Sequence, residues 1–236
     1  MSILAIDTST QVSSVAVASA GRLEAEVTMQ AKMTHSETLM PHIQEALTMA
    51  SVKKEELEGI AVSMGPGSFT GLRIGLATAK AIAYALHIPL IGVPTLQAMA
   101  FHFPVSGLQL LPLMDAQKGN SYVERYTWEH GRLIRKSEVR ILSLAELMEW
   151  ASELPDTVIL LGDVVGKRIE GKVRLPMNVT LAPPHLRMPR AANVAACGFQ
   201  LLENGITGNL MDMEPVYIRR SEAEVLWEKR HEAKQD

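Results

Sequence analysis

The sequence of 236 residues has one cysteine, few aromatic side chains and no long uninterrupted apolar run. A lone thiol at Cys197 cannot form a disulfide within the chain, which fits a reducing compartment. In its alanine-rich segment it is typical of a small buried residue. The longest weakly polar stretch, 74–94, contains Lys80 and His87 and ends in prolines, so it is too interrupted to cross a bilayer. These absences predict a cytoplasmic protein without a membrane span.

A surplus of positive charge and the short motifs of hydrolytic enzymes are also missing. The chain has 23 basic and 26 acidic residues and a formal net charge of −3, whereas proteins that bind nucleic acid alone usually carry a basic surplus. We therefore expect no independent tight RNA binding, although a local patch stays open. No HExxH or GxSxG motif occurs, and His35 and His42 share a helical face without a third metal ligand beside them.

The first half of the sequence has the pattern of three strands followed by a helix, a strand and a helix. Helical spacing begins at Thr34 or Ser36 and continues to about residue 50. A second helix is predicted at 70–86 and a third after Pro94. The strands are predicted at 3–6, 13–18, 23–29, 59–63 and 89–93.

The second half repeats this plan. Strands are predicted at 110–114, 121–128, 133–141 and 157–161, with a helix from Ser143 to Trp150. We assign 1–105 to a first lobe and 106–188 to a smaller second lobe. A last helix at about 189–204 is expected to pack back on the first lobe, and 215–236 forms a charged tail.

Matching positions in the two halves support a duplication. Asp7 and Asp115 each follow the first strand, and Gly21-Arg22-Leu23 corresponds to Gly131-Arg132-Leu133. A period of about 108 residues is too long for a solenoid repeat. Two βββαβα lobes with mixed sheets and flanking helices resemble the actin-like (ASKHA) ATPase superfamily, which predicts the fold and not the activity.

Small residues recur at every fourth position of the helix at 70–86. Gly71, Gly75, Ala79 and Ala83 therefore share one face, and such a face lets another element approach closely. The neighbour is either the helix near 33–49 in the same lobe or a helix of another chain. The predicted interface comprises Met33, His35, Leu39, Ile43, Leu47, Gly71, Leu72, Gly75, Leu76, Ala79, Ile82 and Ala83.

The glycine loop before this helix has a second interpretation. Free N–H groups at a helix N-terminus can hold an anion, and Gly65-Pro66-Gly67 lies between a strand and a helix. Its spacing matches neither the P-loop nor GxGxxG. Close packing is therefore the favoured interpretation, and anion binding the alternative.

Three motifs carry a more specific resemblance. Ile3-Leu4-Ala5-Ile6-Asp7-Thr8-Ser9, His35-Ser36-Glu37 and Gly65-Pro66-Gly67-Ser68-Phe69-Thr70-Gly71-Leu72-Arg73-Ile74-Gly75 resemble the bacterial TsaB (YeaZ) family. Pro94-Thr95, Asp115-Ala116 and Pro215-Val216-Tyr217-Ile218-Arg219 extend the match to nearly the whole chain.

The resemblance implies a component of the machinery that makes N6-threonylcarbamoyladenosine in tRNA. In that machinery the TsaD-like paralogue is catalytic, and a TsaE-like ATPase joins it. The family pairs with the paralogue through first-lobe helices, and the same face is expected to allow a homodimer. Contact with tRNA is expected only through the complex.

The resemblance also implies that this chain is not the catalyst. Where the catalytic paralogue has two metal-binding histidines, this sequence has Thr95 and Met99. A hydroxyl and a thioether do not replace two imidazoles for a divalent ion. We expect no catalytic residues, no metal site and no required cofactor, and these expectations disfavour the alternative of a metallopeptidase.

An autonomous ATPase or kinase is the other alternative. Asp7 and Asp115 stand where actin-like ATPases place the carboxylates that organise metal and phosphates, and Thr8, Ser9 and Lys118 are candidate phosphate ligands. The turn after Asp7 lacks the usual glycine, and strand-end aspartates commonly cap turns. We expect ATP or ADP with Mg²⁺, where it binds, at an interface within the complex.

The end of the tail has two interpretations. Val225, Leu226 and Trp227 form an apolar cluster in a charged segment. The segment is either a solvated helix or a docking segment with Trp227 as its anchor.

Overall fold

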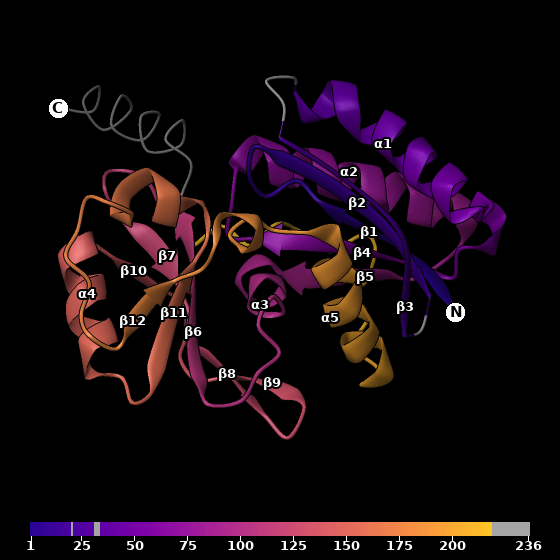
Figure 1. Ribbon diagram of the computed structural model, residues 1–236. Helices are drawn as coiled ribbons and strands as arrows, with labels where there is room; N and C mark the ends of the chain where they lie inside the picture. The colour runs from indigo at the N-terminus through magenta and orange to yellow at the C-terminus, as the bar shows by residue number, and fades with distance from the viewer. Residues whose placement is uncertain (20, 31–33, 219–236) are drawn as a thin grey trace, which may run out of the picture.

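The computed structural model of the chain describes residues 1–19, 21–30 and 34–218. These residues form two α/β lobes, each with its own sheet (Figure 1). Met33, Arg219 and the cluster at 225–227 lie outside the described residues. Within the described residues, no helix is both long and apolar enough to cross a bilayer.

Among its described residues, the first lobe contains five strands and four α-helices. Its sheet has the order β3-β2-β1-β4-β5, with β2 antiparallel to β1 and β3, and β4 parallel to β1 and β5. The elements are β1 (Ser2–Asp7), β2 (Val12–Ser19), β3 (Arg22–Gln30), α1 (His35–Ala50), β4 (Gly59–Gly65), α2 (Phe69–Leu86), β5 (Leu90–Pro94), α3 (Thr95–Ala100) and α5 (Ala191–Glu203).

Alternation along the strands places the core on both faces of this sheet. Leu4 and Ile6 pack with α1 and α2 on one face, whereas Ile3 and Ala5 pack with α3 and α5 on the other. Successive strand residues point to opposite faces, so the apolar run at 3–6 makes β1 a buried central strand. Figure 1 shows α1 and α2 on one side of the sheet and α5 on the other.

The second lobe repeats the strand order of the first. Its sheet runs β10-β7-β6-β11-β12, and β8 and β9 form a hairpin beside β6. This duplication establishes the predicted actin-like fold. The elements are β6 (Leu108–Asp115), β7 (Ser121–Val123), β8 (Tyr126–Glu129), β9 (Arg132–Arg135), β10 (Arg140–Leu142), α4 (Leu144–Glu153), β11 (Thr157–Leu161) and β12 (Val179–Leu181).

The long strands predicted at 121–128 and 133–141 were wrong, because each is broken in two. The breaks lie opposite each other, where the Arg125 N–H donates to Ser137 Oγ at 3.0 Å and the Lys136 N–H donates to the Arg125 carbonyl at 2.7 Å. Beside the break, Tyr126 Oη donates to the buried carboxylate of Glu124 at 2.5 Å. The chain therefore leaves the path of β7, and the β8–β9 hairpin joins the same sheet by pairing with β6.

The two lobes share one hydrophobic core at their junction. Leu96 and Met99 of α3 pack with second-lobe residues, among them Tyr126 and Trp128. The Trp128 indole N–H donates to the Ala100 carbonyl at 3.3 Å. The junction is thus made of packed side chains as well as connecting chain.

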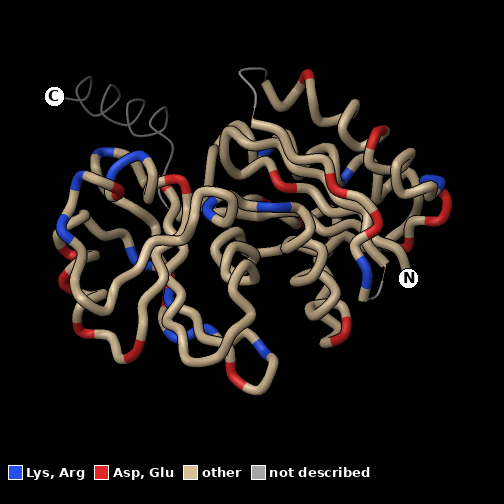
Figure 2. The backbone as a smooth tube through the Cα atoms, in the orientation of Figure 1, with Lys and Arg blue, Asp and Glu red and all other residues tan. Residues whose placement is uncertain are grey.

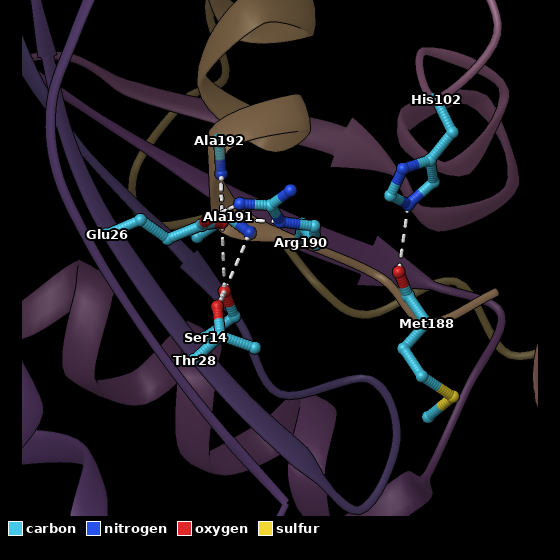
Figure 3. Close-up of polar contacts among 8 residues, drawn as sticks. All are labelled: Ser14, Glu26, Thr28, His102, Met188, Arg190, Ala191 and Ala192. Carbon is cyan, nitrogen blue, oxygen red and sulfur yellow. Dashed lines mark hydrogen bonds and ion pairs between the residues drawn. The ribbon is translucent and has the colours of Figure 1, made fainter. Parts of the chain in front are cut away.

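The beginning of α5 is fixed to the first-lobe sheet by polar contacts (Figure 3). Glu26 of β3 forms an ion pair with Arg190 and accepts the Ala192 N–H at 3.0 Å. Ser14 Oγ accepts the Ala191 N–H at 2.9 Å. A carboxylate here satisfies free N–H groups and complements the positive end of the helix dipole.

Residues 206–218, which we call the strap, run back over the first lobe after α5. Gly208 forms an antiparallel bridge with Leu90 of β5, and Lys80 Nζ donates to the Met211 carbonyl at 3.2 Å. The Val216 N–H donates to the Met64 carbonyl at 2.7 Å. Residues 215–218, predicted as the start of the tail, thus lie against the end of β4.

Candidate functional site: the cleft between the lobes and the outer face of α2

A cleft of about 880 Å³ lies where the first strands of the two lobes end. Its walls come from the turn after β1, the loop before α2, the turn after β6, the segment after β11 and the end of the strap. Its lining includes Ser9, Ser68, Asp115, Asp163 and Tyr217. The ATPase alternative places its metal and phosphate ligands at this end of the two strands.

Asp7 is turned into the protein and does not line the cleft. Its carboxylate accepts the Ser9 N–H at 2.9 Å, the Ser9 hydroxyl at 2.7 Å and the Ser63 hydroxyl. Burial raises the pKa of Asp7, and these hydrogen bonds oppose that rise. The carboxylate therefore caps its own turn and holds β4.

The other predicted phosphate ligands are dispersed. Thr8 is buried, and its hydroxyl donates to the Gly71 carbonyl at 2.7 Å. Ser9 and Asp115 do line the cleft. Lys118 is exposed on the turn between β6 and β7, with a left-handed backbone, and is not among the cleft residues.

The charged groups of the cleft are paired within the second lobe. Arg168 donates to Asp115 at 2.6 Å, Lys167 pairs with Asp163, and Arg187 donates to both carboxylate oxygens of Glu170. Cations already neutralised in this way offer little further charge to a triphosphate. This pairing disfavours the ATPase alternative.

The glycine loop and the start of the small-residue stripe pack against the turn after β1. The Ser68 N–H donates to the Ser9 carbonyl at 2.7 Å. A Cβ at Gly67 would lie 2.5 Å from the Ser9 carbonyl oxygen, and one at Gly71 would lie 2.0 Å from that of Thr8. The glycines allow the backbone of residues 8–9 to approach α2, so the close neighbour is a turn of the same chain.

Most residues of the predicted interface are consequently buried inside the first lobe. The prediction that they form a surface for another chain is therefore corrected. The stripe faces inward, because its small residues and the apolar residues beside it fill the space between α2, α1 and the sheet. Only His35, Leu47 and Ile82 are partly exposed. The buried members are Leu39, Ile43, Gly71, Leu72, Gly75, Leu76, Ala79 and Ala83.

The opposite side of α2 is exposed and almost uncharged. We call Thr70, Arg73, Ala77, Ala81, Tyr84 and Ala85 the outer face of α2; all six are exposed. Tyr84 is 63% exposed, and Met40 and Met49 are exposed on neighbouring α1. An exposed apolar helix face of this kind is typical of an interaction surface.

Thr95 and Met99, which the family resemblance predicted to stand in place of two metal ligands, have structural roles here. Thr95 Oγ1 accepts the Gly65 N–H at 3.1 Å, and Met99 is buried in the core between the lobes. His102 Nε2 donates to the Met188 carbonyl at 2.9 Å (Figure 3), and burial lowers the pKa of His102.

The other two histidines considered as metal ligands contact the first residues of β2 and the turn before it. His35 Nε2 donates to the Thr10 carbonyl at 2.7 Å, and His42 Nδ1 lies 3.0 Å from Ser13 Oγ. Over the part of the chain that the structure describes, no three His, Cys, Asp or Glu residues are placed to hold a metal ion.

One cluster was not found from the sequence. Arg73 lies over the Phe69 ring, 3.8 Å from its centroid, and its Nε donates to Tyr217 Oη at 2.8 Å. All three residues occur in the motifs quoted above, but nothing in the spacing indicated that positions 144 residues apart meet at the rim of the cleft.

Similarity to known proteins assigns the chain to a family. Residues 27–227 match the family model described as TsaD, tRNA N6-adenosine threonylcarbamoyltransferase. The chain is 31% identical over 233 residues to the "tRNA threonylcarbamoyladenosine biosynthesis protein TsaB" of Bacillus subtilis (strain 168), covering 96% of this chain and 98% of that protein. The chain belongs to the TsaB (YeaZ) family. The TsaB protein of Escherichia coli (strain K12) is 28% identical, with 97% and 98% coverage.

Solved structures agree on the fold. A Pseudomonas aeruginosa protein described as similar to peptidase YEAZ superposes with a TM-score of 0.78 at 24% identity, over 92% of this chain and 99% of that one. A second structure, YeaZ from Pseudomonas aeruginosa, gives a TM-score of 0.73 at 22% identity, with the same coverage. The family model and the Bacillus subtilis relative confirm the TsaB (YeaZ) family that the sequence motifs predicted.

Proposed function

We propose that this chain is the non-catalytic scaffold subunit of the machinery that forms N6-threonylcarbamoyladenosine in tRNA. It binds the TsaD-like catalytic paralogue through the outer face of α2 and the neighbouring surface of α1. The observation that carries the proposal is the outer face itself, because α2 exposes alanines and Tyr84 to solvent and has no acidic residue.

The remaining partners follow from this role. A TsaE-like ATPase joins the paralogue, and ATP or ADP with Mg²⁺ binds at an interface of the complex. Figure 2 shows Lys and Arg interspersed with Asp and Glu on both lobes, which is consistent with tRNA contact only through the assembled complex. An isolated chain pairs with a second copy through the same uncovered face. The protein acts in the cytoplasm.

The test is Ala81→Arg, which places a charged side chain in the middle of the outer face. Its matched control is Ala196→Arg, an exposed alanine on α5 at the opposite side of the sheet. Titration calorimetry with the catalytic paralogue from the same genome should show at least about tenfold weaker binding for Ala81→Arg, because a buried unpaired charge costs several kcal/mol. Ala196→Arg should bind normally. Equal affinity of Ala81→Arg and wild type would refute this surface.

A second titration separates the scaffold from the ATPase alternative. The paired charges of the cleft and the inward Asp7 predict no heat of binding when Mg-ATP is added to the isolated chain. Saturable binding of Mg-ATP, lost in Asp115→Ala, would favour the ATPase.

A further inference from the structure

The Arg73 side chain is preorganised at the border of the outer face of α2. Its guanidinium stacks on Phe69, its Nε donates to Tyr217 Oη, and the two rings lie 4.8 Å apart. The aromatic stack uses one face of the guanidinium, and the hydrogen bond uses Nε–H. The two terminal NH₂ groups of Arg73 form no hydrogen bond with the described residues, and Arg73 is exposed.

The guanidinium of Arg73 has no carboxylate partner among the residues that the structure describes. In the described parts, no Asp or Glu forms an ion pair with Arg73. The helix has no acidic residue, and its other cation, Lys80, lies on the same border. The other arginine stacked on an aromatic ring, Arg140 over Trp150, lies in the second lobe.

We propose that Arg73 is the polar anchor of the outer face and binds a carboxylate of the catalytic partner. A planar guanidinium matches a carboxylate with two parallel hydrogen bonds. Because Phe69 and Tyr217 already hold the side chain, little further rotamer entropy is lost on binding. The inference rests on the proposed function and specifies the chemistry of the partner: an apolar helix surface with an Asp or Glu facing the N-terminal end of α2.

Nucleic acid is a weaker candidate for this position. RNA affinity grows with the number of phosphates neutralised, and the nearby cations Lys167, Arg168 and Arg187 already pair with carboxylates. A single free guanidinium beside an apolar helix face suits a protein interface, where arginine and tyrosine are enriched among the residues that dominate affinity.

The experiment is titration calorimetry of the full chain with the catalytic paralogue at about 0.1 M and 0.5 M salt. Arg73→Ala should weaken binding at least about tenfold at low salt and by less at high salt, because screening reduces a rim charge. Arg73→Lys keeps the positive charge and the aliphatic stem over Phe69. On a logarithmic scale it should therefore weaken binding about half as much as Arg73→Ala does. Arg140→Ala removes an equivalent arginine–aromatic stack and should bind within about twofold of wild type.

The outcomes separate this inference from the proposed function. If Arg73→Ala and Arg73→Lys bind like wild type while Ala81→Arg does not, the surface is right and the anchor is wrong. If all three bind normally, the proposed function also fails. Thermal unfolding of each isolated variant is the fold control. An Arg73→Ala chain that binds the paralogue normally but loses affinity for a tRNA probe would overturn the carboxylate in favour of a phosphate.

Discussion

Replacing Gly71 by alanine tests which neighbour the small residues of α2 accommodate: the turn after β1 in the same chain, or a partner protein. The new Cβ would lie 2.0 Å from the Thr8 carbonyl oxygen, so the two atoms must separate by about 1.4 Å to reach the 3.4 Å of an ordinary contact. That movement disturbs the hydrogen bonds from Thr8 Oγ1 to the Gly71 carbonyl and from the Ser68 N–H to the Ser9 carbonyl.

The expected cost combines three effects of known size. Overpacking costs about 1–3 kcal/mol, and each of the two disturbed hydrogen bonds contributes about 1 kcal/mol. The better helix propensity of alanine returns up to about 1 kcal/mol. Gly71→Ala should therefore lower the free energy of unfolding by about 3 kcal/mol, which corresponds to roughly 1 M in the urea midpoint for an m-value near 3 kcal/mol/M.

The assay is equilibrium urea unfolding followed by circular dichroism. Gly166→Ala is the matched control, because its Cβ would meet only the end of the Arg187 side chain, at 3.4 Å, and its midpoint should stay within the range of a neutral change. A Gly71→Ala chain that unfolds at the wild-type urea concentration would show that the close approach of Thr8 is not what the glycine serves.

Two further substitutions test buried carboxylates. Glu26→Gln removes the ion pair with Arg190 and should cost about 1–2 kcal/mol, seen as a melting temperature several degrees lower; Glu45→Gln, exposed on α1, is the control, and equal melting of the two variants would contradict the role of Glu26 at α5. For Glu124, burial raises the pKa above its usual 4.5, so the folded protein holds the proton at higher pH than the unfolded chain does. The stability of wild type relative to Glu124→Gln should accordingly be greatest below pH 4.5 and fall as the pH rises through the folded pKa; a difference that grows with pH in urea unfolding would disprove this.

The strand and helix order was predictable because it depends on local patterns. Apolar runs, the Thr34 and Ser143 caps and the repeated strand-end aspartates each lie within a few residues of the element that they mark. The family also followed from a contiguous motif. These signals do not require knowledge of distant neighbours.

The direction of the small-residue face was not predictable from the same information. Spacing shows that Gly71 and Gly75 share a face, but not that Thr8, 63 residues earlier than Gly71, occupies it. The broken hairpin depends on Ser137 accepting the Arg125 N–H, and the anchor depends on Tyr217 reaching Arg73. Each is a long-range contact, set by how the elements pack.

The core at the junction has a consequence for how the chain folds. Each lobe has a core of its own, but Leu96 and Met99 of the first lobe complete a further core around Tyr126 and Trp128 of the second. An excised 106–188 fragment would expose that shared surface to water and should be less stable than the same lobe within the intact chain. The repeat is visible in the strand order, whereas the first lobe supplies part of the packing of the second.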